Sequence, residues 1–319
     1  MWTLLTFVMF LARSPDGLEP TDRLIPAGYT GNPWGPEANR ARTAGELPPI
    51  VVSETMGKWR VWGKRVLREG DIVFRRADAR ILHGFFPFSR FLANVTGSAF
   101  SHTGIVKLVD GEPWVYDTTA AGPRLQPFYV WILDNVGAFG VKRVRNELRS
   151  HIPAAVAFCN DLYLKQAPFD YELAIDDRAY YCVEMTEKAY RASGLPLSEA
   201  VRIGDMENVT KFPICVFMFN KFAHLEIDQP VYCPGNERHG IWSSKSLEQV
   251  YPPKPRAASR PKAKSTKSST RPASRASTGS GANLKDSRTN PEAEVPSIPG
   301  PALPPSNAPR AAAPKSRAA

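Results

Sequence analysis

The sequence predicts one α+β domain with a small antiparallel sheet, extending over residues 56–251. A β-hairpin is the strongest local signal, because Asp110-Gly111 is a favoured two-residue turn between the apolar, strand-like segments 103–109 and 114–119. A second signal is the helical spacing of apolar residues over 182–193. No internal repeat divides this stretch, so we expect its strands and helices to share one core.

The other elements are predicted from periodicity and from the positions of Gly and Pro. In chain order they are a helix over 56–67, a strand over 72–74, a loop with a short helix over 78–97, a strand over 140–145 and a helix over 152–164. The helix over 182–193 is expected to end at Gly194, with Pro196 beyond it. Residues 13–55 are rich in Pro and Gly and predict an irregular arm over the body.

The basic charge of the chain is concentrated at its C-terminal end. Residues 252–319 carry 13 Lys and Arg against 3 Asp and Glu, whereas residues 1–251 carry 28 of each sign. This segment also holds 13 of the 30 prolines and lacks aromatic residues, so we expect a disordered tail. Contact with an anionic surface and a simple spacer role are both open for it. Because the body is neutral, no specific nucleic-acid partner is expected.

The first residues form an apolar segment. Residues 2–12 are apolar throughout apart from two threonines, but the run is too short to span a bilayer, which needs about 20 apolar residues. It is similar to the apolar region of a signal peptide, yet it lacks a basic start and a clear cleavage site. Residues 1–12 therefore predict either export or membrane contact, with the protein in the cell envelope, or a plain buried segment of a cytoplasmic protein.

The four cysteines show no metal-binding pattern. Neither a CxxC pair nor zinc-finger spacing occurs, and HExxH, Walker and GxGxxG motifs are missing from the sequence. We therefore expect no metal and no cofactor. Cys159 and Cys215 lie in apolar runs typical of a core, and a Cys215–Cys233 disulfide is conceivable only for an exported chain.

Cys182 and His102 are the candidate catalytic pair. Cys182 begins the helix predicted over 182–193, where free backbone N–H groups and the helix dipole favour a thiolate. His102 begins the first strand of the hairpin, and an imidazole near a thiol can act as its general base. The alternative is a small buried cysteine and a satisfied core histidine.

The hairpin turn predicts a third residue of the candidate site, Asp117. If Asp110-Gly111 is the two-residue loop, paired positions sum to 221, so His102 faces Thr119 and Gly104 faces Asp117. His102 and Asp117 are then diagonal neighbours on one face, about 7–8 Å apart along the backbone. Because Gly104 has no side chain to intervene, Asp117 is expected to reach and orient the imidazole.

Four short motifs then occur in a distinctive order. They are Gly70-Asp71-Ile72-Val73-Phe74, Ser101-His102-Thr103-Gly104-Ile105-Val106, Phe169-Asp170-Tyr171 and Tyr181-Cys182-Val183-Glu184. Over roughly residues 65–195 the chain resembles the YiiX/YaeF-type permuted papain-like cysteine hydrolases, a group related to the NlpC-like peptidases and the lecithin–retinol acyltransferases. The resemblance implies a permuted papain-like (NlpC-like) α+β fold with the nucleophile at a helix N-terminus.

The same resemblance implies roles for individual residues. Cys182 would be the nucleophile, His102 the general base and Asp117 the acidic third residue, although relatives often carry Glu at that position. Many relatives have Ser where this chain has Val183, so this part of the pocket is expected to differ. Glu184 matches the family's acidic residue two positions after the cysteine.

Four further residues are candidates for supporting or substrate-binding roles. Ser101 is expected either to line the pocket or to lie at a strand edge. The hydroxyl of Tyr181 is expected near an oxyanion or, alternatively, in the aromatic core. Asp170 is expected to shape the loop before Cys182, and Glu184 to be structural because residues two apart do not share a helix face.

These observations predict a cysteine hydrolase, an amidase, peptidase or acyl-ester hydrolase that works through an acyl-enzyme. The expected substrate is a cell-wall peptide or a lipid-linked amide or ester. An acyl group is favoured by the phenylalanines that precede His102, which core packing explains nearly as well; they are Phe85, Phe86, Phe88, Phe91 and Phe100. The alternatives are a non-catalytic wall- or lipid-binding module tethered by its tail, and an adaptor in which only residues 252–319 matter.

Overall fold

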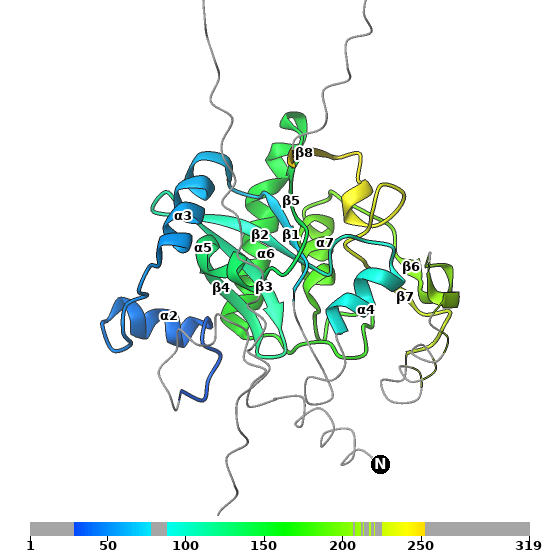
Figure 1. Cartoon of the computed structure of the whole chain (residues 1–319), viewed down its shortest axis with the longest axis horizontal. Helices are drawn as coiled ribbons and strands as arrows, with labels where there is room; N and C mark the ends of the chain where they lie inside the picture. Colours follow the sequence, from blue (N-terminus) through cyan, green and yellow to red (C-terminus); the bar gives the residue numbers. More distant parts are fainter. Residues whose placement is uncertain are drawn as a thin grey trace, which may run out of the picture.

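The structure is a computed structural model, shown in Figure 1. It describes residues 29–77, 88–206, 208–211, 213, 217, 220 and 225–252. The predictions made for residues 1–12, for Cys215, for Phe85 and Phe86, and for the tail beyond Pro252 lie outside the described residues.

A six-stranded antiparallel sheet forms the centre of the domain, with strand order β4-β3-β2-β1-β5-β8 (Figure 1). Its strands are β1 (Ile72–Arg75), β2 (His102–Val109), β3 (Glu112–Thr119), β4 (Gly122–Pro127), β5 (Phe139–Val144) and β8 (Leu247–Tyr251). A separate two-stranded sheet pairs β6 (Val201–Arg202) with β7 (Pro230–Val231). The predicted strands over 72–74 and 140–145 are thus confirmed as β1 and β5.

The hairpin has the predicted register. Ile105 pairs with Tyr116 and Val106 with Val115, so paired positions sum to 221. Asp110 and Gly111 both have positive φ, 50° and 77°, as a tight hairpin turn of the primed type requires. Beyond this ladder, at the start of β2, His102 pairs with Arg75 of β1.

Helices cover both faces of the sheet. They are α2 (Pro36–Thr43), α3 (Glu54–Val66), α4 (Phe88–Val95), α5 (Phe128–Trp131), α6 (Ile152–Lys165) and α7 (Cys182–Ala192). Short 3-10 helices are η2 (Ile132–Asp134), η3 (Asn146–His151), η4 (Ile203–Asp205), η5 (Val209–Lys211) and η6 (Ile241–Ser243). In the described part of the chain, no helix is both long and apolar enough to cross a membrane.

The arm over residues 13–55 is not irregular throughout, because α2 lies within it. Tertiary contacts explain the helix. Trp34 is fully buried with Met56 and Val130, and Asn39 donates from its side chain to the Leu125 carbonyl of β4 at 2.7 Å. Docking of this kind supplies the stability that a single eight-residue helix lacks in water.

Two apolar clusters show which side chains face which helices. Ile105 packs in a cluster with residues of α6 and α7, whereas Val106 packs in a cluster with residues of α3 and α5. Since successive side chains on a strand point to opposite faces, Thr103 shares the α7 side and His102 shares the α5 side. The start of β2 therefore presents different side chains to the two helical layers.

Candidate active site

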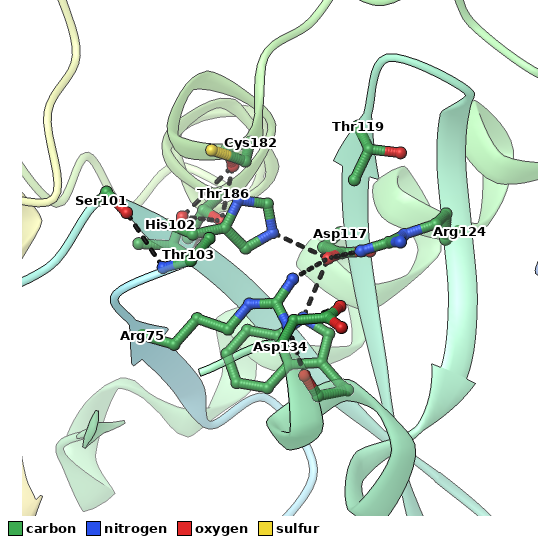
Figure 2. Close-up of polar contacts among 12 residues, drawn as sticks. Arg75, Ser101, His102, Thr103, Asp117, Thr119, Arg124, Asp134, Cys182 and Thr186 are labelled. Carbon is green, nitrogen blue, oxygen red and sulfur yellow. Dashed lines mark hydrogen bonds and ion pairs between the residues drawn. The ribbon is translucent and has the colours of Figure 1, made fainter. Parts of the chain in front are cut away.

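Cys182 begins α7, and two threonines fix this end of the helix against β2. Thr103 and Thr186 both donate to the Cys182 carbonyl oxygen, at 3.2 Å and 3.1 Å, and their hydroxyls lie 2.9 Å apart (Figure 2). Both threonines are fully buried. Strand and helix are thus joined one residue away from His102.

His102 and Asp117 form the side-chain contact that the hairpin register predicts. His102 Nε2 lies 2.7 Å from Asp117 Oδ2, and both residues are buried. Gly104 allows this arrangement, because a Cβ there would lie 2.5 Å from Val115 Cγ1 and 2.8 Å from the Tyr116 carbonyl oxygen. Any larger residue at position 104 would push β2 and β3 apart.

His102 and Cys182 lie together. Since Nε2 is bonded to Asp117, the imidazole nitrogen on the side of Cys182 is Nδ1, as Figure 2 shows. Burial alone would lower the pKa of His102, but the charge and hydrogen bond of Cys182 and the hydrogen bond of Asp117 raise it from 6.5 to about 9. The arrangement favours an imidazolium.

The pKa of the Cys182 thiol is lowered, whereas that of His102 is raised. Burial would raise the pKa of Cys182, but the charge and hydrogen bond of His102 and the Thr103 backbone amide lower it below its ordinary value. A lowered cysteine pKa beside a raised histidine pKa favours a thiolate–imidazolium pair over a neutral thiol and imidazole. Such a pair is an activated nucleophile.

Asp117 is held by two further residues that the sequence analysis missed. Arg124 of β4 donates from Nε to Oδ1 at 3.0 Å and from Nη2 to Oδ2 at 2.8 Å, and Trp131 Nε1 donates to Oδ2 at 2.9 Å. Burial would raise the pKa of Asp117, but the charge of Arg124 and the bonds from His102 and Arg124 lower it far below 3.8. Asp117 is therefore a carboxylate at every working pH.

A second buried ion pair lies beneath the imidazole. Arg75 of β1 is fully buried, contacts Asp134 of η2 at 3.0 Å and donates to the Trp131 carbonyl. Its guanidinium also lies 4.4 Å from the Trp131 ring centroid, and the Trp131 ring lies 6.1 Å from that of His102. Arg75 and Asp134 gave no sequence signal, because each resembles an ordinary surface charge until the fold buries it.

Ser101 and Tyr181 are both engaged by the surrounding backbone. Ser101 Oγ accepts from the Ala77 N–H at 3.1 Å, beside the start of β2, which is the strand-edge arrangement. Tyr181 is buried, and its hydroxyl accepts from the Tyr232 N–H at 2.6 Å and donates to the Tyr232 carbonyl at 3.2 Å. That hydroxyl belongs to the core rather than to an oxyanion site.

Along the chain, Asp170 precedes the segment that leads to Cys182, and Glu184 follows it. Asp170 Oδ1 accepts from the Glu172 N–H at 2.8 Å, within the loop that precedes α7. Glu184 is fully buried, accepts from the Tyr181 N–H at 3.4 Å and pairs with Lys188 at 3.0 Å. Burial raises the pKa of Glu184 to about 7 against the effect of Lys188.

Two other cysteines in the described part of the chain are inert by comparison. Cys159 and Cys233 are buried free thiols, and burial raises the pKa of both, that of Cys233 to about 12. Among the described residues no group of three or more His, Cys, Asp or Glu side chains is arranged to hold a metal ion.

Comparison with known proteins gives a match to a family model and similarity to solved structures. Residues 66–213 match the family of permuted papain-like amidase enzymes, YaeF/YiiX, C92 family. No curated protein matches the chain at a significant level. Among solved structures, the chain is similar to the "metalloprotein yiiX from Escherichia coli O157:H7", with 19% identity and a TM-score of 0.47, over 57% of this chain and 96% of that one.

The matched segment contains β1, the hairpin, the loop at Asp170 and the start of α7, and the antiparallel sheet with flanking helices has the α+β architecture expected of such a domain. The resemblance predicted from the four motifs is therefore confirmed, because residues 66–213 match the model of the permuted papain-like amidases of the YaeF/YiiX type.

Proposed function

We propose that the protein is a cysteine hydrolase that cleaves an amide through an acyl-enzyme, with Cys182 as nucleophile, His102 as general acid and base, and Asp117 as the residue that orients His102. The observation that supports this most directly is the hydrogen bond of His102 to Asp117 with Cys182 on the other side of the imidazole (Figure 2), together with a lowered pKa of the thiol and a raised pKa of the imidazole. The family's description as amidases supports the bond type.

Acylation begins from the thiolate–imidazolium pair. The Cys182 sulfur attacks the amide carbonyl carbon, and the oxygen becomes an oxyanion. Backbone N–H groups at the start of α7 supply the positive end of the helix for that charge. His102 Nδ1 donates its proton to the leaving nitrogen as the C–N bond breaks, which leaves a neutral imidazole and a Cys182 thioester.

Deacylation uses the altered charge of the same site. In the thioester the sulfur carries no charge, so the chief influence that raises the pKa of His102 is gone, while burial and Arg75 still lower it. His102 is then a neutral base that removes a proton from water. The hydroxide attacks the thioester, the acid product leaves, and the thiolate–imidazolium pair is restored.

For the substrate we propose an amide in a cell-wall peptide or a lipid-linked molecule, and for the protein a place in the cell envelope. The argument for an acyl group from the phenylalanines before His102 is weakened for Phe100, which packs against Phe74 and Trp242 in the core. Phe91 lies in a separate buried cluster with Val95 and Met206. Neither ring is free to bind substrate.

The test is the pH dependence of alkylation at Cys182 in wild type and in His102→Ala, followed by amide hydrolysis with wild type and Cys182→Ala. We expect alkylation at pH 6 in wild type, with a thiol pKa in the range of about 3.5–7.5 typical of activated cysteines, and an ordinary or raised pKa in His102→Ala. Cys182→Ala is the matched control, since labelling that survives in it belongs to other thiols. An ordinary thiol profile in wild type, unchanged in His102→Ala, would overturn the proposal.

A further inference from the structure

The charges that surround His102 are arranged as two buried ion pairs. The charged and titratable groups that face the imidazole from the elements around it are Cys182 of α7, Asp117 of β3, Arg124 of β4, Arg75 of β1 and Asp134 of η2. Arg124 binds Asp117 through two hydrogen bonds, and Arg75 lies against Asp134. Each carboxylate thus has a guanidinium partner.

The Arg124 guanidinium lies within hydrogen-bonding distance of the Asp117 carboxylate, and both groups are shielded from solvent. Both residues are almost completely buried, and the guanidinium meets both carboxylate oxygens side-on, the strongest geometry for such a pair. Arg75 Nη2, in contrast, lies 3.8 Å from Asp117 Oδ2, beyond hydrogen-bonding distance. The positive charge closest to Asp117, apart from the imidazolium itself, is therefore that of Arg124.

Resting on the proposed function of His102, we propose that Arg124 is a positioning residue that neutralises Asp117, so that this carboxylate orients the imidazole without supplying a net negative charge to it. The imidazolium then depends on the Cys182 thiolate for its counter-charge. His102 holds its proton while the thiolate is present and releases it when the sulfur is acylated.

The electrostatic surroundings of His102 agree with this division of roles. After burial, which lowers the pKa of His102, the largest influence is the charge of Cys182, which raises it, and Asp117 acts through its hydrogen bond. An uncompensated Asp117 would keep the imidazole protonated in the acyl-enzyme and slow deacylation. Arg124 would thus determine how readily His102 changes from acid to base.

A double-mutant cycle on the full chain tests the proposal. The readout is the pKa of His102, followed by NMR of protein labelled at histidine Cε1, with the signal assigned from its loss in His102→Gln. The variants are Arg124→Gln, Asp117→Asn, the two combined, and Arg124→Lys as the conservative control that keeps the charge.

The proposal predicts opposite shifts for the two single variants. Arg124→Gln leaves Asp117 uncompensated and raises the pKa of His102 by about one unit, whereas Asp117→Asn leaves Arg124 uncompensated and lowers it by about one unit. The combined variant removes both charges and returns the pKa to within about half a unit of wild type. Arg124→Lys stays near wild type.

The contrary result is equally distinct. If Asp117 acts on His102 as a net anion, the combined variant lowers the pKa as much as Asp117→Asn alone, and the proposal is overturned. The combined variant carries no unpaired buried charge, so it keeps the test available if Arg124→Gln fails to fold. Failure of the proposed function is distinguished by a separate measurement. Wild-type Cys182 would then be alkylated with the pH dependence of an ordinary thiol, regardless of the His102 pKa measured in the Arg124 variants.

Discussion

His102 and Thr103 are consecutive on β2 and engage Cys182 in two different ways. The His102 imidazole, on the α5 side of the strand, lowers the pKa of the Cys182 thiol, whereas the Thr103 hydroxyl, on the α7 side, donates to the Cys182 carbonyl oxygen at 3.2 Å. A strand places successive side chains on opposite faces. One two-residue segment therefore both lowers the pKa of the Cys182 thiol and fixes the helix that carries this residue.

The first prediction concerns Gly104, which lies between His102 and Asp117 along the hairpin. Gly104→Ala places a Cβ 2.5 Å from Val115 Cγ1 and 2.8 Å from the Tyr116 carbonyl oxygen, so β2 and β3 must separate. We expect a loss of about 1–3 kcal/mol in the free energy of unfolding, typical of overpacking, together with slower Cys182 alkylation at pH 6. Urea unfolding and the alkylation rate measure the two effects.

A matched glycine provides the control for this prediction. Gly57 lies in α3, and a Cβ added there meets nothing within 4 Å. Gly57→Ala is expected to leave alkylation unchanged and to stabilise the chain by up to about 1 kcal/mol, the usual difference between the two residues in a helix. Equal effects of the two substitutions would contradict the role given to Gly104.

The second prediction concerns the threonines that join β2 to α7. Thr186→Val keeps the shape of the side chain but removes its hydroxyl. The substitution therefore removes the hydrogen bond to the Cys182 carbonyl oxygen and the hydrogen bond with the Thr103 hydroxyl. We expect a loss of about 1–2 kcal/mol in unfolding free energy and a severalfold slower alkylation of Cys182, because the start of α7 is less firmly held. Thermal unfolding and alkylation at pH 7 provide the measurements.

Thr118→Val is the control for that experiment. Thr118 is also buried, but its hydroxyl finds no hydrogen-bond partner among the described residues. Replacing an unsatisfied buried hydroxyl by a methyl group is expected to leave stability unchanged or increase it. A loss in Thr118→Val as large as that in Thr186→Val would mean that hydroxyl removal alone, rather than the link to Cys182, explains the effect.

The sequence predicts more of the site than of its surroundings, for identifiable reasons. The contact of His102 with Asp117 follows from one turn, Asp110-Gly111, because hairpin register depends only on local residues. Arg124 could not be predicted, since the strand that carries it, β4, includes Pro123 and Pro127 and has no alternating pattern. Residues paired by local geometry can be found from sequence, whereas charges buried by distant segments cannot.

The small elements that the sequence analysis missed share this explanation. α5, β8 and the pair β6–β7 are short, and each is stabilised by contacts with distant residues rather than by its own periodicity. α5 is an example, with four residues of which Phe128, Val130 and Trp131 are buried. So short a segment carries too little pattern to separate a helix from a buried strand.

The third prediction is that the pKa of His102 depends on Cys182. In wild type the pKa of His102 is about 9, and burial and Arg75 oppose this increase. Cys182→Ser removes the thiolate, so the pKa of His102 is expected to fall by more than one unit, as observed by histidine NMR titration. A pKa that stays near 9 in Cys182→Ser would show that the thiolate is not its cause.

The same pair has a specific effect on stability. The raised pKa of His102 contributes stability that is complete below pH 6.5 and is lost as the pH rises through about 9. The lowered pKa of Cys182 contributes stability that is gained as the pH rises toward 9. With the proposed thiolate–imidazolium pair present in the folded chain across this range, the folded and unfolded chains each hold one proton on the two groups, so the contributions cancel. The stability difference between wild type and Cys182→Ser/His102→Ala is therefore expected to be constant from pH 6.5 to 9, as urea unfolding measures.

The fourth prediction concerns Glu184, whose pKa burial raises to about 7 from 4.5. A raised carboxyl pKa means that the folded chain binds the proton more tightly, so stability is lost as the pH rises from 4.5 through 7. Glu184→Gln removes that loss, and its stability relative to wild type is expected to increase by up to about 3 kcal/mol between pH 4.5 and pH 8.

Glu187 provides the contrast, because it is equally buried on α7 but its carboxylate is well bonded. It accepts from the Leu197 and Ser198 N–H groups, both at 3.0 Å, and from Ser198 Oγ at 2.9 Å. Glu187→Gln weakens all three bonds and is expected to destabilise the chain across the whole pH range. A Glu184→Gln difference that does not change with pH would mean that Lys188 already holds Glu184 ionised at pH 4.5, and that the charge beside Cys182 is fixed rather than titrating.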